Sequence, residues 1–561
     1  MHPSTLAKRG TVLLFLAIVA VYFYGLGHLP FVGPDEPRYA QVAREMFLRH
    51  DLITPTLGGH TWFEKPALLY WMMILSFKLF GVSEWAAHLP AAISGVLTVV
   101  AVFVVGRRVE RNEDPDNELQ SYAFWSALAA ATTIGIVVFS RAASFDIVLT
   151  MTTTWALAFY ILYDLDERLF CYADVNVKLR RRFLAGFYTF IGLSLLAKGL
   201  VGIVIPLGVL GLYHLFQKSL PGRHLLISLV WGLPLALTVA ATWYAPVIRR
   251  HGWPFIDQFF IQHHFARYIS NKYHHSQPFY YYLLVVPLLT LPWTAFLIDG
   301  LLQLKSWLRR AKAAVPDCTD ARLSPSMVFA LAWFLFPLVF FSFSGSKLPG
   351  YVLPMLPAAA LIVGRQLWRL RSDSRSWPLR TTATLYLLFA IIALGYSWRT
   401  GNLPHKFALL MAAPLLAAGC FPFLFARKPT TSVGLLVAAT VAVLIVAMYC
   451  VAPAFAELDS SKRLLQLAEA RGYSQTAIYG MQRSDRTPEF YAAGRVVYGA
   501  NGEAIMYEGP GQVIDECRKR RDVLLAFVPI GDVSKLTGMA SAQTEVIGNN
   551  GRYAIVAVRA R

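Results

Sequence analysis

The stretch TTSVGLLVAATVAVLIVAMYCVA, residues 430–452, carries no charged side chain. A helix of about 20 apolar residues spans the hydrocarbon core of a bilayer, so this stretch predicts a transmembrane helix. The chain changes character directly after it. Residues 453–561 are polar and contain strand-like runs and one amphipathic helical run, SSKRLLQLAEARG. The stretch therefore separates a membrane part from a small soluble α/β domain.

The composition of the whole chain indicates a polytopic membrane protein. Of 561 residues, 56% are hydrophobic and 15% are charged, whereas soluble globular chains carry about 25% charge. This excludes a disordered chain, a collagen-like chain and an ordinary cytosolic enzyme. The five cysteines are scattered, so they predict neither a disulfide scaffold nor a zinc site. The positive-inside rule explains much of the net charge of +19, and we expect no nucleic-acid partner.

We predict a mostly α-helical fold with about thirteen transmembrane helices. They cover residues 11–27, 87–106, 122–142, 146–164, 183–200, 201–217, 225–246, 279–299, 326–344, 351–368, 379–397, 406–425 and 430–452. The segment 66–81 is short, aromatic and interrupted by Lys78, so we place it at the membrane interface. With a cytoplasmic N-terminus, this assignment puts the Arg- and Lys-rich loops in the cytoplasm and the C-terminus outside.

The predicted organisation is a transmembrane domain, residues 1–452, followed by an external α/β domain, residues 453–561. The outer loops 28–86 and 247–278 are expected to form the rim of an active site. The α/β domain shows no nucleotide-binding fingerprint. We expect it to have a structural role, such as packing on the catalytic face.

Ionisable groups near the membrane are costly unless they are paired or face water, so those that the positive-inside rule leaves unexplained mark candidate functional positions. All of them fall on the predicted outer side. In FVGPDEPRYAQVAREM, Asp35 and Glu36 begin an amphipathic helix, Arg38 follows one turn on, and Tyr39 lies on the apolar side. Asp35 is either the N-cap of this helix or a carboxylate that faces a cavity.

Three further positions lie in the later part of the first outer loop and at the outer mouth of the second span. In TWFEKPALLYW, Lys65 precedes the apolar interfacial helix. It either snorkels to the headgroups or binds a lipid phosphate. Glu84 and His88 follow with the i, i+4 spacing of one helix face.

Two more candidates on the predicted outer side lie further along the sequence, between residues 140 and 200. Asp146 follows the third span close to Arg141, so it either pairs with Arg141 in a turn or faces a cavity. Lys198, in LSLLAKGLVG, lies between two apolar runs without an acid beside it in the sequence. A buried unpaired lysine is costly, which favours a phosphate partner.

The outer loop 247–278 is basic, which runs against the positive-inside rule. It contains Arg250 and Arg267 and a cluster of histidines that includes His264. Binding of an anion is the economical explanation. A solvated helix face and a His–carboxylate metal site are the alternatives.

The run FSGSKLPGYVLPMLP places Lys347 and Tyr351 at the outer end of a span, and its prolines are tolerated where backbone lines a cavity. A cavity with carboxylates and fixed cations suits a phosphate-bearing amphiphile and a reacting sugar. No nucleotide sugar is present outside the cell, so an activated donor has to arrive on a lipid. The predicted reaction is glycosyl transfer from a polyprenyl phosphate. Cations would stabilise the departing phosphate, and a carboxylate would orient or deprotonate the acceptor.

The ordered set of these motifs resembles a known family. An Asp-Glu pair near the N-terminus, FEKP, EWAAHLP, an isolated Asp after the third span, AKG and SKLPGYVLPMLP are similar to the protein mannosyltransferase-like branch of the GT-C glycosyltransferases. Within this branch the chain most resembles the bacterial lipid A aminoarabinose transferases, over about residues 1–370. His88 departs from the pattern, because these relatives usually carry Arg there, and this puts its pairing with Glu84 in doubt.

The resemblance implies a monomeric, multi-pass enzyme of the bacterial inner membrane whose active site and C-terminal domain are periplasmic. It would transfer 4-amino-4-deoxy-L-arabinose from undecaprenyl phosphate to lipid A phosphates, which confers resistance to polymyxin. Asp35, Glu36 and Asp146 would be the catalytic carboxylates. The residues that would bind substrate or lipid phosphate are Arg38, Tyr39, Lys65, Glu84, Lys198, Arg250, Arg267, Lys347 and Tyr351. Glu84 with His264 is a candidate position for a divalent metal, and no other cofactor is expected.

Two other activities stay open as alternatives. The first is another polyprenyl-phosphate-sugar transferase, which would act on protein or O-antigen. The second is a lipid flippase or transporter. Transporters usually show repeated halves and charges at the membrane midplane, whereas here no repeat is evident and the charges gather on one face. The isolated basic groups disfavour a non-enzymatic scaffold.

Overall fold

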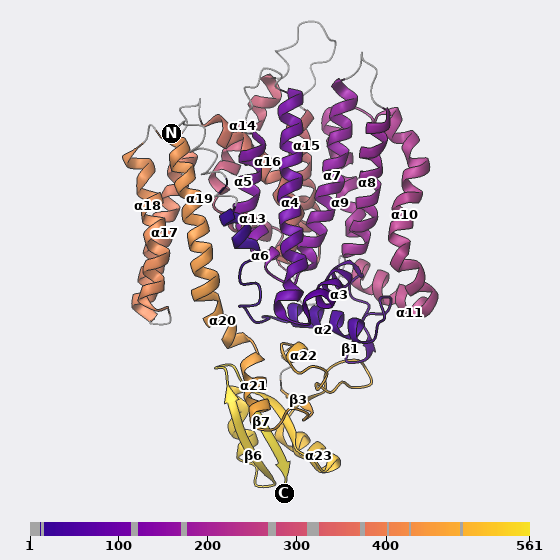
Figure 1. The fold of residues 1–561 in the computed structure, drawn as a ribbon, viewed down its shortest axis with the longest axis vertical. Coiled ribbons are helices and arrows are strands. Elements are labelled where there is room, and N and C mark those ends of the chain that lie inside the picture. Colours follow the sequence, from indigo (N-terminus) through magenta and orange to yellow (C-terminus); the bar gives the residue numbers. More distant parts are fainter. Residues whose placement is uncertain are drawn as a thin grey trace. The chain divides into compact units, whose positions relative to one another are not determined.

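The computed structural model describes residues 12, 16–113, 122–169, 177–266, 277–310, 325–370, 376–400, 403–425, 428–482 and 486–561. Figure 1 shows its helices and strands. The chain forms two compact units, each built from separate segments. The first contains Met1–Tyr24, Glu64–Leu69 and Pro90–Val446. The second contains Gly25–Phe63, Tyr70–Leu89 and Ala447–Arg561, so the first outer loop groups with the C-terminal residues.

The first unit is an assembly of apolar helices. Its elements are residues 16–23, most of α4 (Glu84–Glu113), α5 (Tyr122–Thr132), α6 (Ile134–Ser140), α7 (Phe145–Leu169), α8 (Val177–Lys198), α9 (Val201–Gln217), α10 (Arg223–His251), α11 (Trp253–Ile256), the π-helical η1 (Asp257–Ala266), α13 (Tyr281–Leu289), α14 (Thr294–Arg310), α15 (Pro325–Ser342), the 3-10 helix η2 (Pro349–Met355), α16 (Leu356–Arg369), α17 (Trp377–Thr400), α18 (His405–Leu424) and α19 (Pro429–Val446). Within the described ranges, eight helices are long and apolar enough to cross a membrane, or up to ten if each bent pair is one span. This makes the chain a multi-pass membrane protein, while the number of thirteen spans stays a prediction.

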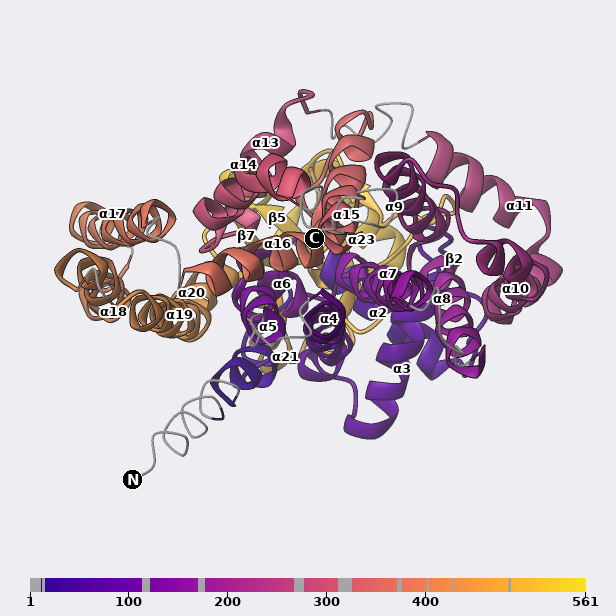
Figure 2. The same cartoon turned by 90° about the horizontal axis from the view of Figure 1, so that it is seen from above.

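Burial separates central from peripheral helices in this unit. The apolar window of Pro349–Arg369 is 94% buried and that of α7 is 83% buried, whereas α10 and α17 reach only 28%. Figure 2 shows α17, α18 and α19 gathered as a group beside the other helices. The central helices can therefore bring polar side chains together away from lipid, because lipid contact falls to the outer ones.

Two of the predicted spans are bent pairs in the structure. The predicted single helix 279–299 consists of α13 and α14, which meet at an angle of 114°. Pro292 lies at the break, and proline has no N–H with which to continue a helix. The predicted span 122–142 bends by 57° between α5 and α6. Sequence hydropathy misses both bends, since apolar residues continue through them.

The two bends satisfy each other's polar groups. The backbone N–H of Ile134, at the start of α6, donates to the carbonyl of Leu291 over 2.9 Å. The indole N–H of Trp293 donates to the hydroxyl of Thr132, also over 2.9 Å. Unsatisfied backbone groups are costly in a membrane interior, so these bonds stabilise both interruptions.

The second unit carries the first outer loop and a mixed sheet. Its elements are α2 (Asp35–Leu48), β1 (Thr56–Leu57), β2 (His60–Thr61), most of α3 (Leu68–Phe80), η3 (Ala447–Val451), α20 (Ala452–Asp459), α21 (Lys462–Ala470), β3 (Ile478–Met481), α22 (Pro488–Tyr491), β4 (Met506–Tyr507), α23 (Pro510–Arg520), β5 (Leu524–Pro529), η4 (Ile530–Asp532), α24 (Val533–Thr537), β6 (Ala542–Asn549) and β7 (Tyr553–Ala560). At 13 residues, α3 is about 20 Å long, which is too short to cross a bilayer and fits its interfacial placement.

The sheet has the strand order β4-β3-β5-β7-β6. β3 runs parallel to β4 and β5, while β7 is antiparallel to β5 and β6. Leu464, Leu465 and Ala468 of α21 pack in a core cluster on one face, and residues of α23 pack in a second cluster on the other. The strand-like run 495–499 forms isolated bridges instead of a named strand.

Candidate functional site

Asp146 and Lys198 form an ion pair within the first unit. Asp146 is the second residue of α7 and Lys198 is the last residue of α8, and the two helices pack against each other. The Lys198 ammonium lies 4.7 Å from the centre of the Tyr351 ring, in cation–π range. The expectation that Lys198 is an unpaired cation is therefore wrong. Its acid comes from 52 positions away, so inspection of neighbouring residues could not find it.

The environment of Asp146 also differs from the expected turn pair. Arg141 donates to the backbone carbonyls of Val21, over 2.6 Å, and Tyr24, over 3.0 Å. Gly350 of η2 lies directly against the Asp146 carboxylate. A Cβ added to Gly350 would lie 2.3 Å from the Asp146 Oδ2 atom, so only glycine lets η2 approach α7 this closely.

Lys347 contributes a buried ammonium beside η2. Its side chain is 7% exposed, and its Nζ donates to the carbonyls of Ser344, over 2.7 Å, and Gln277, over 3.0 Å. An ammonium has three N–H donors, so these bonds leave one for a further acceptor. Within the part of the chain that the structure describes, no carboxylate forms an ion pair with Lys347. The hydroxyl of Tyr282 donates to the next carbonyl, that of Leu348, over 3.1 Å and fixes this segment.

The other candidates of the first unit have mixed outcomes. The Lys65 ammonium pairs with Glu64 over 2.8 Å. Glu64, which stands next to Lys65 in FEKP, is not among the predicted site residues. Arg250 lies exposed in the last turn of α10. Arg267 and the side chain of His264 lie outside the described residues.

Asp35 and Arg38 form an ion pair at the start of α2, in the second unit. The N-cap position is held by Pro34 without a side-chain cap, so the N-cap alternative for Asp35 is wrong. The Arg38 guanidinium lies 5.2 Å from the Trp62 ring centre and 5.5 Å from that of Tyr39. Asp35 remains 52% exposed, so its carboxylate is accessible to a ligand.

The i, i+4 spacing of Glu84 and His88 suggests that they pair with each other, but each has a different partner in the structure. The Nε2 atom of His88 lies 3.5 Å from the Glu36 carboxylate. Its Nδ1 atom donates to the carbonyl of Leu26 over 2.8 Å, because a carbonyl can only accept. The Glu84 carboxylate instead pairs with Lys462 over 2.6 Å. His88 therefore faces Glu36, and the doubt about its pairing with Glu84 is justified.

The candidate residues are distributed over both compact units, and the convergence of their side chains on one cavity stays a prediction. Asp35, Glu36, Arg38, Tyr39 and Glu84 belong to the second unit. Lys65, Asp146, Lys198, Arg250, Lys347 and Tyr351 belong to the first. Across the described ranges, no three His, Cys, Asp or Glu side chains are close enough to hold a metal ion. The Glu84–His264 metal position remains a prediction, and the side chain of His264 lies outside the described residues.

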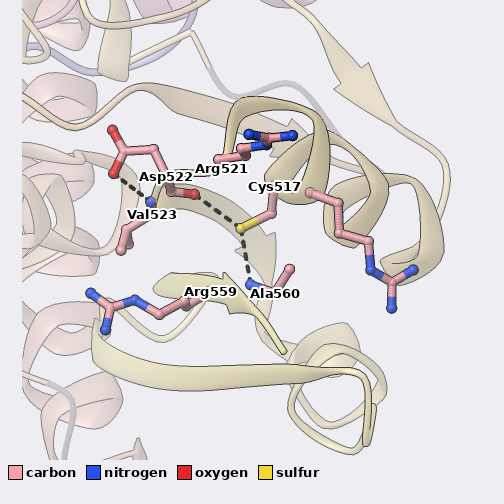
Figure 3. A pocket seen from close by; sticks show the side chains of 7 residues that line it. Cys517, Arg521, Asp522, Val523, Arg559 and Ala560 are labelled. Carbon is pink, nitrogen blue, oxygen red and sulfur yellow. Dashed lines mark hydrogen bonds between the residues drawn. The ribbon is translucent and has the colours of Figure 1, made fainter.

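One cavity of about 480 Å³ lies in the sheet-bearing part of the second unit. Figure 3 shows Cys517 at its centre, with its sulfur hydrogen-bonded to the backbones of Asp522 and Ala560, while Arg521 and Arg559 extend to opposite sides. The arginines do not converge on one point, so they offer no anion cradle. The cavity contains none of the predicted site residues.

Comparison with known proteins gives consistent matches. The family model described as dolichyl-phosphate-mannose-protein mannosyltransferase matches residues 10–246. A protein of Serratia proteamaculans named undecaprenyl phosphate-alpha-4-amino-4-deoxy-L-arabinose arabinosyl transferase is 28% identical over 390 residues, which are 69% of this chain and 65% of the relative. Its namesake from Pseudomonas paraeruginosa is 30% identical over 391 residues, 68% of this chain and 64% of the relative. The matches thus span less than two thirds of the length of these relatives.

A solved structure extends the likeness to nearly the whole chain. The crystal structure of ArnT from Cupriavidus metallidurans bound to undecaprenyl phosphate has a TM-score of 0.77 and covers 98% of this chain and 97% of that chain. The sequences are 24% identical, so this comparison shows a common fold. It includes the C-terminal sheet, which lies beyond the matched family model.

Proposed function

We propose that the chain is an ArnT-like member of the GT-C glycosyltransferases and that it transfers 4-amino-4-deoxy-L-arabinose from undecaprenyl phosphate to a phosphate of lipid A. The reaction takes place on the periplasmic side of the bacterial inner membrane. The added amino sugar brings a positive charge to lipid A. It therefore weakens the binding of cationic peptides such as polymyxin.

The buried Lys347 ammonium is the observation that carries this proposal. Two backbone carbonyls orient it, and one N–H remains for a ligand. A lysine is a strong phosphate ligand because it supplies a fixed positive charge to the phosphate oxygens. The Lys198 ammonium contacts the ring of Tyr351, which follows Lys347 by four residues. These two cations match the negative charge that a lipid phosphate brings.

The proposed reaction breaks one bond and forms one. A phosphate oxygen of lipid A attacks the anomeric carbon of the sugar, and the bond from this carbon to the undecaprenyl phosphate oxygen breaks. The departing phosphate takes the bonding electron pair, and lysine ammonium groups stabilise the charge that develops there. The attacking phosphate is already ionised at neutral pH. The step therefore needs no strong general base.

This chemistry assigns the carboxylates to orientation. The amino sugar is an ammonium at neutral pH, and a carboxylate is its natural partner. Asp35 is half exposed, so it is available for this contact. Asp146 is paired with Lys198, and we assign it the task of holding that lysine in place.

The test is transfer by the purified full-length protein in lipid nanodiscs that contain undecaprenyl phosphate-linked aminoarabinose and lipid A. Mass spectrometry is expected to show lipid A heavier by one pentosamine residue. Lys347→Met is expected to lose the product, while Lys218→Met, a change of the same kind after α9, is expected to retain it. Sugar transfer to protein or O-antigen instead of lipid A would contradict the proposed acceptor. Movement of the lipid across the membrane without sugar transfer would favour a flippase.

The same assay tests the metal position. Loss of transfer in a chelator, with recovery on addition of a divalent cation, is expected if Glu84 and His264 hold a metal. Transfer that is indifferent to the chelator would contradict it.

A further inference from the structure

The turn that leads into α2 obtains hydrogen-bond acceptors from the C-terminal part of the chain. The backbone N–H of Phe31 donates to the hydroxyl of Tyr491 over 2.8 Å, and these residues are 460 positions apart. The backbone N–H of Gly33 donates to the Asp459 carboxylate over 2.9 Å, across 426 positions. Gly33 has a φ of +64°, which favours glycine. Both donors lie within four residues of Asp35.

Apolar packing joins the same two segments. The Phe31 side chain is fully buried, and its ring meets Phe490 edge to face, with ring centres 4.8 Å apart at 86°. Arg44, further along α2, donates to the carbonyl of Phe490 over 3.3 Å, with its guanidinium 5.7 Å from the ring centre. The short helix α22 therefore packs against both the entry turn and the body of α2.

An ion pair also connects the C-terminal part of the chain to the start of α4. Glu84, at the start of α4, pairs with Lys462 of α21 over 2.6 Å, with side-chain exposures of 14% and 34%. The Tyr491 hydroxyl also interacts with Glu84, which links this pair to the Phe31 hydrogen bond. The Glu84 carboxylate is thus engaged by the C-terminal part of the chain.

Electrostatics extend the link to Arg38. Glu489 of α22 is buried, which raises the pKa of its carboxyl, while the charges of Arg486 and Arg38 act to lower it. Arg38 is the ion-pair partner of Asp35. Arg38 therefore interacts with an acid from each of the two segments.

We propose that Lys462, Tyr491 and Asp459 are positioning residues, which hold the turn at residues 31–34 so that Asp35 and Glu36 keep their productive orientation. Lys462 acts through its ion pair with Glu84 at the start of α4. The identity of the reaction that Asp35 and Glu36 serve rests on the proposed function.

A charge reversal and its conservative counterpart test this inference. Lys462→Glu places two acids face to face, whereas Lys462→Arg keeps a cation opposite Glu84. Lys535→Glu is the matched control, because Lys535 pairs with Asp532 in the same part of the chain, away from the turn. The first readout is backbone hydrogen exchange of peptides covering residues 27–38, without substrate. The second is the split of the transfer rate into kcat and KM.

We expect Lys462→Glu to accelerate exchange at Phe31 and Gly33 and to lower kcat, each by about tenfold, with KM little changed. Lys462→Arg is expected to keep both values close to those of the wild type, and Lys535→Glu to match the wild type. Tyr491→Phe keeps the ring packing but removes the acceptor of the Phe31 N–H, so it is expected to accelerate exchange at Phe31 even if Lys462→Glu folds poorly.

Two results would overturn the inference. Unchanged exchange of residues 27–38 in both Lys462→Glu and Tyr491→Phe would show that the contact does not hold the turn. A wild-type kcat in Lys462→Glu, although exchange of residues 27–38 is faster, would show that the turn does not orient the catalytic carboxylates. Because exchange is measured without substrate, the inference can hold even if the wild-type protein transfers no aminoarabinose, which would overturn only the proposed function.

Discussion

Substitution of Lys198 by methionine tests the energetics of the central ion pair. The change keeps most of the apolar stem and leaves the Asp146 carboxylate without its cation. At an effective dielectric constant of about 20, two unit charges about 4 Å apart attract by about 4 kcal/mol. Removal of one partner of a buried pair typically costs about 3–5 kcal/mol. The two side chains are 15% and 21% exposed, so we expect a loss of about 3 kcal/mol, the lower end of this range.

The measurement is the free energy of unfolding of the purified full-length protein, titrated with sodium dodecyl sulfate in mixed micelles. Asp146→Asn is expected to cost less than Lys198→Met, because the Tyr351 ring still attracts the lysine, a contact of about 0.5–2 kcal/mol. The double variant removes both charges and is expected to be more stable than Lys198→Met alone. All three variants are expected to lose transfer.

The reasoning fails if Lys198→Met changes the free energy of unfolding by less than about 0.5 kcal/mol, the scatter expected of an ordinary surface change. It also fails if the double variant is no more stable than Lys198→Met. Either result would mean that solvent or lipid headgroups already screen the pair.

Four further outcomes are expected. Asp35→Asn abolishes aminoarabinose transfer, and wild-type polymyxin tolerance in cells that carry only this variant would refute its role. Lys65→Ala weakens undecaprenyl phosphate binding, and an unchanged affinity in a lipid-binding assay would count against it. Gly350→Ala forces the Asp146 carboxylate away and costs about 1–3 kcal/mol of unfolding free energy, whereas Gly434→Ala, which faces open space, costs little. Burial raises the pKa of the Glu489 carboxyl, so the stability that Glu489 contributes falls as pH rises from below 4.5 through the raised pKa. The stability of Glu489→Gln relative to the wild type is therefore expected to be higher at pH 7 than at pH 4. Thermal unfolding of both proteins at the two pH values is the measurement.

Helices of the membrane part could be predicted from the sequence, because hydropathy is a property of neighbouring residues. Residues 146–164 are apolar enough to predict a span, and α7 covers them. The bend within 279–299 depends on a distant partner. Leu291 and Trp293 bond to Ile134 and Thr132 of another bent span, and no window of neighbouring residues contains that information.

The same distinction applies to the candidate site. The motifs selected Lys198 and Lys347 as important because isolated cations in apolar runs are rare. The partners of each lysine could not be predicted from the sequence. Helix packing brings Asp146 to Lys198, and Lys347 donates to backbone carbonyls. Glu84 is a similar case. Its i, i+4 spacing from His88 suggested a local pair, which the departure of His88 from the family pattern put in doubt, and its ion-pair partner in the structure is Lys462, beyond the last span.

The mutual bonding of the two bent spans constrains how the protein is made. Trp293 and Thr132 are 161 positions apart, so the ribosome delivers the α5–α6 interruption to the bilayer long before the α13–α14 interruption that caps it. During this interval the N–H of Ile134 lacks the acceptor that it has in the finished protein. The stabilisation that these two bonds give to the bend of the early span is therefore complete only after residues 291–293 have been added.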